Sequence, residues 1–234
     1  FTASGTGTSW LWSVNGSGTN STTSGTTAGS YTVVATDGNS CTNTATGILI
    51  VNTIPTVSVN SEVVCSDAGA TTFTASGTGT SWLWSVNGSG TNSTTSGTTA
   101  GSYTVVATDG NSCTNTATGI LTVNTIPAVT VNSEVVCSDV GAVTFTATSA
   151  TATGYVWSDN GLGTLATTSG TTVGDYTVVV TDANTCTNTA TGTLTVNTIP
   201  TVSVNSETTC SDAGAVTFTA TSGTATGYLW SANG

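Results

Sequence analysis

The 234-residue chain carries eleven acidic side chains and no lysine, arginine or histidine, so its formal charge is −11. A chain without cations cannot neutralise phosphates, which excludes nucleic acid as a partner and disfavours docking on an anionic membrane. No apolar run approaches the ~18 residues that a membrane span needs, so membrane insertion is excluded as well. We also expect no catalysis, because no histidine or lysine can activate a nucleophile and the only close acidic pair, Glu62 and Asp67, has the character of a structural pair.

An internal repeat organises the chain. Residues 1–49 are identical to residues 73–121, and further copies begin at Phe145 and Phe218. An Asn-Thr-Ile-Pro tetrapeptide occurs once per repeat, and its proline cannot continue a central strand. The predicted modules are therefore residues 1–55, 56–127, 128–200 and 201–234. The first lacks its first strand and the last holds only three strands. We interpret the chain as a segment of a longer array, with strands supplied by a neighbouring subunit as the alternative.

The second copy shows the predicted strands in chain order. Alternating apolar and polar residues, rich in β-branched types, indicate strands with one face inward. The strands are residues 57–64, 71–75, 81–86, 103–108 and 114–123, with at most two short strands in the polar run 87–101. Asp109-Gly110-Asn111 is typical of a tight turn. Short strands with frequent turn signals predict an all-β fold, a tandem array of small immunoglobulin-like antiparallel sandwiches.

Aromatic residues mark the third strand of every copy. A tryptophan occurs once per copy, and we expect it in the core, as in immunoglobulin-like sandwiches; these residues are Trp12, Trp84, Trp157 and Trp230. The position two residues earlier is also aromatic, as Trp10, Trp82, Tyr155 and Tyr228. Those side chains are either core residues or a platform for a sugar. The apolar residues between the two positions, such as Leu83, point to the opposite face, and a repeated stripe of this kind indicates a packing surface.

Six cysteines recur in two positions, one after the first strand of a module and one after the tyrosine strand. They are Cys41, Cys65, Cys113, Cys137, Cys186 and Cys210. Without histidine or a C-x-x-C pair, a zinc site is improbable, and no base is present to activate a nucleophilic cysteine. A small module with a thin core gains stability from a disulfide in an oxidising compartment.

The pairing depends on the number of strands between the tryptophan strand and the tyrosine strand. One strand places both cysteines of a module at the same end, and Cys65–Cys113 and Cys137–Cys186 then form. Two strands place them at opposite ends, so that a bridge links neighbouring modules, for example Cys65 to Cys186. Because the polar run is short for a hairpin, we expect the within-module bridges, each worth about 3–4 kcal/mol for a loop of about 48 residues. Cys41 and Cys210 then pair outside this sequence.

Three motifs together resemble a known group of repeats. They are Cys65-Ser-Asp-Ala-Gly69, Trp84-Ser-Val-Asn-Gly88 and the stretch 101–113, Gly-Ser-Tyr-Thr-Val-Val-Ala-Thr-Asp-Gly-Asn-Ser-Cys. They are similar to the tandem immunoglobulin-like or PKD-like repeats of secreted surface proteins of Bacteroidota, such as the SprB-type repeats of gliding adhesins. The resemblance implies an extracellular or cell-surface location on a bacterium and a stalk, adhesin or filament role. Those repeats usually carry glycine before the cysteine, where this chain has Ser40, Ser112 and Thr185.

Two further sets of residues are candidate sites. Acidic residues recur beside the cysteines, and their oxygens would suit Ca²⁺, although turn formation explains them without a metal; they are Asp67, Asp109, Asp139 and Asp182. Asparagines in N-x-S/T patterns are candidate glycan acceptors, namely Asn15, Asn20, Asn87 and Asn92. Apart from calcium, no cofactor is expected.

The predicted function is mechanical. Near-identical repeats set the reach of an extracellular fibre or adhesin stalk, and the expected partners are other repeats of the same kind and glycans. The alternative is an array of carbohydrate-binding modules, with the aromatic residues of the Trp82 position and the run 87–101 as the sugar face.

Overall fold

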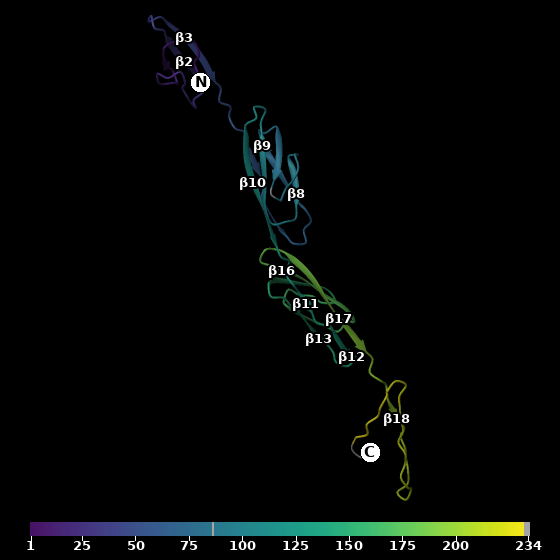
Figure 1. Cartoon of the computed structure of the whole chain (residues 1–234). Helices are drawn as coiled ribbons and strands as arrows, with labels where there is room; N and C mark the ends of the chain where they lie inside the picture. Colours follow the sequence, from purple (N-terminus) through teal and green to yellow (C-terminus); the bar gives the residue numbers. More distant parts are fainter. Residues whose placement is uncertain (86, 232–234) are drawn as a thin grey trace. The chain divides into compact units, whose positions relative to one another are not determined.

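A computed structural model describes residues 1–85 and 87–231, and in those residues every regular element is a strand (Figure 1). No helix in this part of the chain is long and apolar enough to cross a membrane. Contacts divide the chain into two compact units, Phe1–Val63 with Gly69–Thr122 and Val64–Ala68 with Val123–Gly234. The short segment Val64–Ala68 of the second repeat therefore belongs with the unit that contains the third repeat.

The first and fourth repeats contain few strands. In the first repeat, β1 (Ser9–Ser13), β2 (Gly29–Thr36) and β3 (Thr42–Leu49) form one antiparallel sheet in the order β1-β2-β3. In the fourth repeat, β18 (Ser203–Val204) pairs with β19 (Ala220–Thr221).

The described residues of the second repeat and of the third repeat each form seven strands in two sheets. In the second repeat, the sheet β4-β6-β8 consists of β4 (Val57–Val59), β6 (Thr71–Gly77) and β8 (Thr94–Gly97). The sheet β5-β10-β9-β7 consists of β5 (Glu62–Cys65), β10 (Thr114–Asn124), β9 (Gly101–Thr108) and β7 (Ser81–Ser85). In the third repeat, the sheet β11-β13-β15 consists of β11 (Thr130–Val131), β13 (Val143–Thr148) and β15 (Thr167–Gly170). The sheet β12-β17-β16-β14 consists of β12 (Glu134–Cys137), β17 (Thr187–Asn197), β16 (Gly174–Asp182) and β14 (Ala152–Asp159).

The first strand of the third repeat changes sheets halfway along. β11 pairs antiparallel with β13, and β12 then pairs parallel with β17. Asn132 holds the crossing point, because its side-chain amide donates to Glu134 Oε1 at 2.6 Å and its Oδ1 accepts from the Thr146 N–H at 2.6 Å. The sequence predicts one antiparallel strand here, whereas the structure has two short ones, the second of them parallel to the last strand.

The core of the third repeat is organised around Tyr176. Its ring stacks on Phe145 at 4.0 Å between ring centres, and its hydroxyl donates to the Thr172 carbonyl at 3.0 Å. A Cβ at position 170 would overlap that hydroxyl, so only glycine fits beside the tyrosine. Trp157, on the third strand, is 3% exposed. A tyrosine corner, a tryptophan on the third strand and two facing sheets define an immunoglobulin-like sandwich, so the fold is all-β and built of such sandwiches.

The polar run after the tryptophan strand crosses the sandwich without forming a strand. The Trp157 N–H donates to the Gly163 carbonyl at 3.0 Å, and its indole Nε1 donates to the Leu165 carbonyl at 2.9 Å. β15 follows this run and pairs antiparallel with β13 in the other sheet. The pairing directions require β14 and β15 to run the same way, so the run between them carries the chain back to the opposite end. The chain makes two passes here although only one of them is a strand.

Candidate functional site

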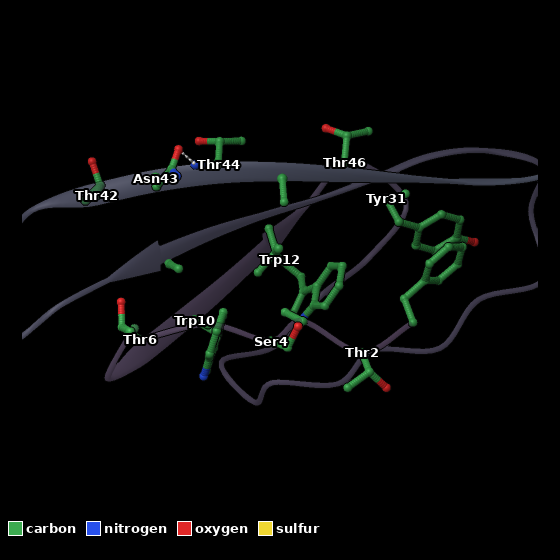
Figure 2. A pocket seen from close by; sticks show the side chains of 18 of the residues that line it. Thr2, Ser4, Thr6, Trp10, Trp12, Tyr31, Thr42, Asn43, Thr44 and Thr46 are labelled. Carbon is green, nitrogen blue, oxygen red and sulfur yellow. Dashed lines mark hydrogen bonds between the residues drawn. The ribbon is translucent and has the colours of Figure 1, made fainter.

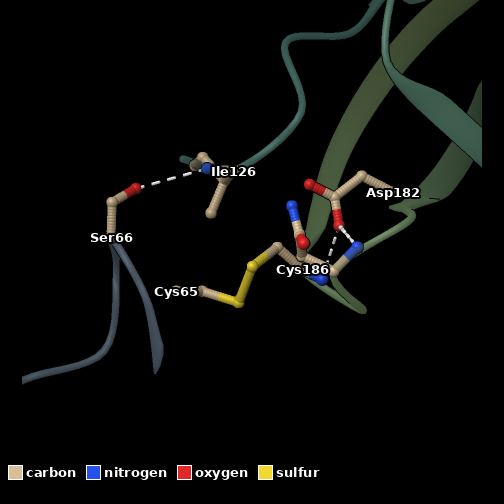
Figure 3. The surroundings of a disulfide bond; sticks show 6 residues. Cys65, Ser66, Ile126, Asp182 and Cys186 are labelled. Carbon is tan, nitrogen blue, oxygen red and sulfur yellow. Dashed lines mark hydrogen bonds between the residues drawn. A yellow bond between two sulfur atoms is a disulfide. The ribbon is translucent and has the colours of Figure 1, made fainter. Parts of the chain in front are cut away.

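The joint between the second and third repeats is crossed by a disulfide. Cys65 and Cys186 are bonded with their Cα atoms 5.6 Å apart, and 121 positions separate them in the sequence (Figure 3). Both cysteines belong to the same compact unit, because the Cys65 segment packs with the third repeat. Cys186 is 1% exposed, so this bridge lies in a closed contact.

The expectation of within-module bridges, Cys65–Cys113 and Cys137–Cys186, is wrong. In the third repeat Cys186 directly precedes β17, whereas Cys137 pairs with Asn197 at the last residue of β17. Eleven residue steps of strand separate those two levels by about 36 Å, far beyond the ~7 Å between Cα atoms that a disulfide spans. Because the polar run adds a second pass and the first strand lies parallel to the last, the two cysteines of one module fall at opposite ends.

The turn before Cys186 is shaped by a buried carboxylate. Asp182 Oδ1 accepts from the backbone N–H groups of Asn184 and Cys186, both at 2.9 Å, and only 8% of Asp182 is exposed. The turn places Thr185 at a φ of +64°. This is the left-handed region that favours glycine. Asp182 is therefore the residue that presents Cys186 to its partner.

The linker of this joint is held from both sides. Ser66, next to Cys65, donates its backbone N–H to the Asn124 carbonyl at 2.8 Å and accepts the Ile126 N–H on its Oγ at 3.3 Å. Asn188 of the third repeat donates its side-chain amide to the Pro127 carbonyl at 2.9 Å, and Pro127 is fully buried. The Asn-Thr-Ile-Pro segment is thus bonded to the repeat before it and to the repeat after it.

The other cysteines in the described residues are free. Cys41, Cys137 and Cys210 are exposed and Cys113 is half-exposed. The pairing of Cys41 and Cys210 with residues outside this sequence stays a prediction.

The candidate calcium ligands divide into two kinds. Asp67 and Asp139 are exposed, while Asp109 and Asp182 have an oxygen already bonded to two backbone N–H groups. The bridge places the Asp67 turn with the Asp182 turn, whereas the expected Cys65–Cys113 bridge would have brought it to Asp109. No three metal-ligating side chains gather in the described part of the chain. Calcium binding stays a prediction, and the turn bonds explain Asp109 and Asp182 without it.

The four candidate glycan acceptors are not equivalent. The side-chain amides of Asn15 and Asn87 donate to the carbonyls of Ser30 and Ser102 at 3.2 and 3.1 Å. Asn160 makes the same bond in the third repeat, where the acceptor pattern is absent, so this asparagine ties the loop to the tyrosine strand. Asn20 and Asn92 are exposed, and only their backbone carbonyls are engaged, each by a tryptophan indole. Asn20 and Asn92 are therefore the better placed acceptors.

The predicted core tryptophans have different surroundings. Trp12, Trp84 and Trp157 are 6%, 3% and 3% exposed. Trp230 is 48% exposed in the fourth repeat, whose described part contains only β18 and β19, and its place in a core stays a prediction.

The aromatic residues of the sugar-platform alternative are partly covered. Trp10, Trp82 and Tyr155 are half-buried, and Trp10 and Tyr155 pack against the cores of their repeats. Tyr228 is 49% exposed, in the fourth repeat. On the opposite face Leu83 lies beside Val106 and is 56% exposed, so the predicted outer stripe reaches the surface.

A pocket of about 560 Å³ lies in the first repeat, and Trp10, Trp12 and Tyr31 are among the side chains that line it (Figure 2). Its lining includes Ala3 and Gly47. Their counterparts in the second repeat are covered by the first strand: Ala75 pairs with Val59, and a Cβ on Gly119 would meet the Asn60 carbonyl. The pocket therefore lies where the first strand packs in the second repeat, and the position of that strand explains the pocket without a ligand.

Comparison with known proteins gives neighbours at low similarity. No protein-family description and no curated protein matches the chain. Among solved structures, Drosophila OTK extracellular domains 3–5 align over 81% of this chain and 85% of that one, with 16% identity and a TM-score of 0.41. The titin I-band fragment I67–I69 aligns over 73% and 75%, with 15% identity and a TM-score of 0.37. A 1.5-MDa bacterial ice-binding adhesin aligns over 73% and 74%, with 22% identity and a TM-score of 0.35.

The sequence pattern reveals the cysteines and the turn, but it does not reveal the residues that hold the linker or the residue that holds the crossing point of the first strand. Ser66, Asn132 and Asn188 act through hydrogen bonds to backbone groups of distant segments. The available signal is their recurrence: Cys-Ser-Asp, Val-Asn-Ser-Glu and Thr-Asn-Thr each occur at fixed places in the repeat. Composition explains such residues as ordinary turn formers, so only their position at a joint reveals their role.

Proposed function

We propose that this chain is a structural part of an extracellular repeat protein, forming a fibre or an adhesin stalk on a bacterial surface. The observation that carries the proposal is the Cys65–Cys186 bridge, which joins consecutive repeats covalently. A disulfide persists in oxidising surroundings, which supports a location outside the cytoplasm. No chemistry is assigned to the joint, and its bonds serve to hold neighbouring repeats together.

The bridge changes how the chain responds to tension. Force applied at the two ends passes through the sulfur atoms, so the residues between Cys65 and Cys186 carry none of it. Those 121 positions would otherwise contribute about 400 Å of extended chain. A joint of this kind suits a stalk, because an unfolded repeat would lengthen and slacken the structure.

Single-molecule pulling tests this mechanical role. The oxidised chain, held at its ends, is expected to gain about 400 Å of extension once a reductant is added, because the bypassed residues then unfold under load. The Cys113→Ser variant is the matched control and should behave like the unchanged chain, since Cys113 is free. An oxidised chain that already extends to its full length would contradict the proposal.

Electron microscopy of native material tests the biological role. Antibodies against the chain should decorate stalks or filaments at the cell surface. Labelling confined to the cytoplasm, or to surface material without extended structures, would overturn the fibre proposal. It would not bear on the Cys65–Cys186 bridge itself.

The carbohydrate-binding alternative is weaker because its aromatic residues are half-buried. It predicts binding to a glycan array that Trp82→Ala abolishes and that the outer-face variant Leu83→Ala leaves unchanged. Glycan binding that survives the change at Trp82 would remove that position from consideration.

A further inference from the structure

We propose that Cys113 and Cys137 form bridges of the same kind as Cys65–Cys186, each with another repeat of this type. The partner of Cys113 is the first-strand cysteine of a preceding repeat, and the partner of Cys137 is the tyrosine-turn cysteine of a following repeat. This inference deepens the proposed structural role and rests on it only for its biological meaning. Its test is chemical, so it can fail while the fibre role stands.

The turn that carries Cys113 has the same shape as the turn that carries the bonded Cys186. Asp109 Oδ1 accepts from the N–H groups of Asn111 and Cys113 at 2.8 and 2.9 Å, matching the bonds of Asp182. The φ of Ser112 is +63° and that of Thr185 is +64°. Cys113 is half-exposed while Cys186 is closed off, so the two sites differ in whether a first-strand cysteine covers them.

The segment that carries Cys137 has the same shape as the segment that carries the bonded Cys65. The Val140 N–H donates to the Cys137 carbonyl at 3.1 Å, as the Ala68 N–H does to Cys65 at 3.0 Å. Ser138 donates its N–H to the Asn197 carbonyl at 2.8 Å and accepts the Ile199 N–H on its Oγ at 3.3 Å. Ser66 makes the same two bonds at the bridged joint. The linker after the third repeat is therefore held by the repeat before it in the same way as the bridged linker is.

The bond forms by thiol–disulfide exchange. A cysteine thiolate attacks an external disulfide, either oxidised glutathione or the active disulfide of an oxidoreductase outside the cytoplasm, and one thiol leaves. The partner cysteine, as thiolate, then attacks the mixed disulfide and releases the second thiol. Two cysteine thiols are oxidised to one disulfide and the external disulfide is reduced to two thiols. The two departing sulfurs leave as thiolates and take up the two protons that the cysteines gave up, so no net proton is released.

Bridges at every joint would make two interlaced covalent paths along the array. From Cys186 the chain reaches the next first-strand cysteine, Cys210, after 24 residues, and there it would cross another bridge. The repeat distance of two modules, from Cys65 to Cys210, is 145 residues. Fully stretched, the bridged path is about 90 Å per two modules, compared with about 520 Å without bridges. Bridges at every joint would therefore prevent the array from unfolding to its full length under tension.

Two complementary variants of the full chain test the pairing rule, and both retain Cys65–Cys186. The first carries Cys41→Ser and Cys113→Ser, which leaves only first-strand cysteines free. The second carries Cys137→Ser and Cys210→Ser, which leaves only tyrosine-turn cysteines free. After mixing in a glutathione redox buffer, we expect disulfide-linked heterodimers to exceed homodimers by about tenfold, as a docking preference of about 1.4 kcal/mol gives.

The same mixture in denaturant is the control, because unfolded thiols pair statistically. Equal amounts of homodimers and heterodimers in the folded mixture, or the absence of linked dimers, would overturn the proposal. Native material then identifies the source of the partner repeat. If the mass of the native species falls on reduction, the partner repeats belong to a second chain. If the mass does not fall, and no free thiol is found before reduction, the partner repeats belong to the same chain. Alkylation of Cys113 and Cys137 as free thiols in native material would also overturn it.

Discussion

The turns Asp109–Cys113 and Asp182–Cys186 differ at two positions, Gly110 against Ala183 and Ser112 against Thr185, and they fold alike. Their carboxylates make the same two hydrogen bonds, and their backbones share the same left-handed residue. One cysteine is nevertheless free and half-exposed, and the other is bonded and buried. The difference lies outside the turn, in the Val64–Ala68 segment that covers only the second of them. The local sequence determines the shape of the turn, and contact with another repeat determines whether its cysteine is free or bonded.

The largest difference in stability between the two turns is expected when each cysteine is replaced. Cys186→Ser deletes a bridge that closes a loop of 121 positions, and we expect a loss of about 4–5 kcal/mol in the free energy of unfolding. Cys113→Ser should change stability by less than about 0.5 kcal/mol, because no bond is lost. Guanidinium unfolding without reductant, followed by tryptophan fluorescence, measures both. Equal losses would show that Cys113 is bonded too.

Removing each carboxylate should produce a smaller difference. Asp182→Ala leaves two backbone N–H groups without a partner in a closed site, and we expect a loss of about 2–3 kcal/mol. Asp109→Ala should cost less, because water reaches the half-exposed turn of the second repeat. Asp182→Asn keeps an acceptor oxygen and should recover part of the loss. The same unfolding measurement applies, and a larger effect at Asp109 would contradict the assignment of a closed joint.

Changes in the tyrosine corner should destabilise the second and third repeats equally, because this corner lies inside each repeat and not at a joint. Tyr103 and Tyr176 donate their hydroxyls to the carbonyls of Thr99 and Thr172, both at 3.0 Å. We expect Tyr103→Phe and Tyr176→Phe each to cost about 1 kcal/mol. Thermal unfolding of the two variants checks this, and a clearly unequal pair would show that the neighbouring repeat also stabilises the corner.

Glycine at the left-handed position should give the smallest effect, and a stabilising one. A β-branched residue at a φ of +64° is strained, so Thr185→Gly should stabilise the chain by about 0.5 kcal/mol after the entropy cost of glycine. Ser112→Gly should act in the same direction. A destabilised Thr185→Gly variant would indicate that the threonine side chain supports the joint in a way that the turn geometry does not explain.

The sequence predicts the strands and the all-β sandwich well, because alternation shows which side chains turn inward. Tyr103 and Trp84 carry that signal and are buried. It predicts the turn at Asp109 as well, since aspartate, glycine and asparagine suit a reversal. The disulfide prediction fails because it depends on counting passes of the chain. The run 160–166 makes a pass without strand periodicity, so no pattern in those residues reveals it.

By itself the sequence determined the repeat, the strand faces, the core aromatic residues and the shape of the turn that presents each cysteine. These depend on side chains close in sequence or on the inward and outward periodicity of strands. Only the tertiary structure decided that β12 lies parallel to β17 and that Cys65 meets Cys186. Those outcomes depend on the direction of non-adjacent segments and on hydrogen bonds from Ser66, Asn132 and Asn188 to distant backbone groups, and short-range pattern carries no record of either.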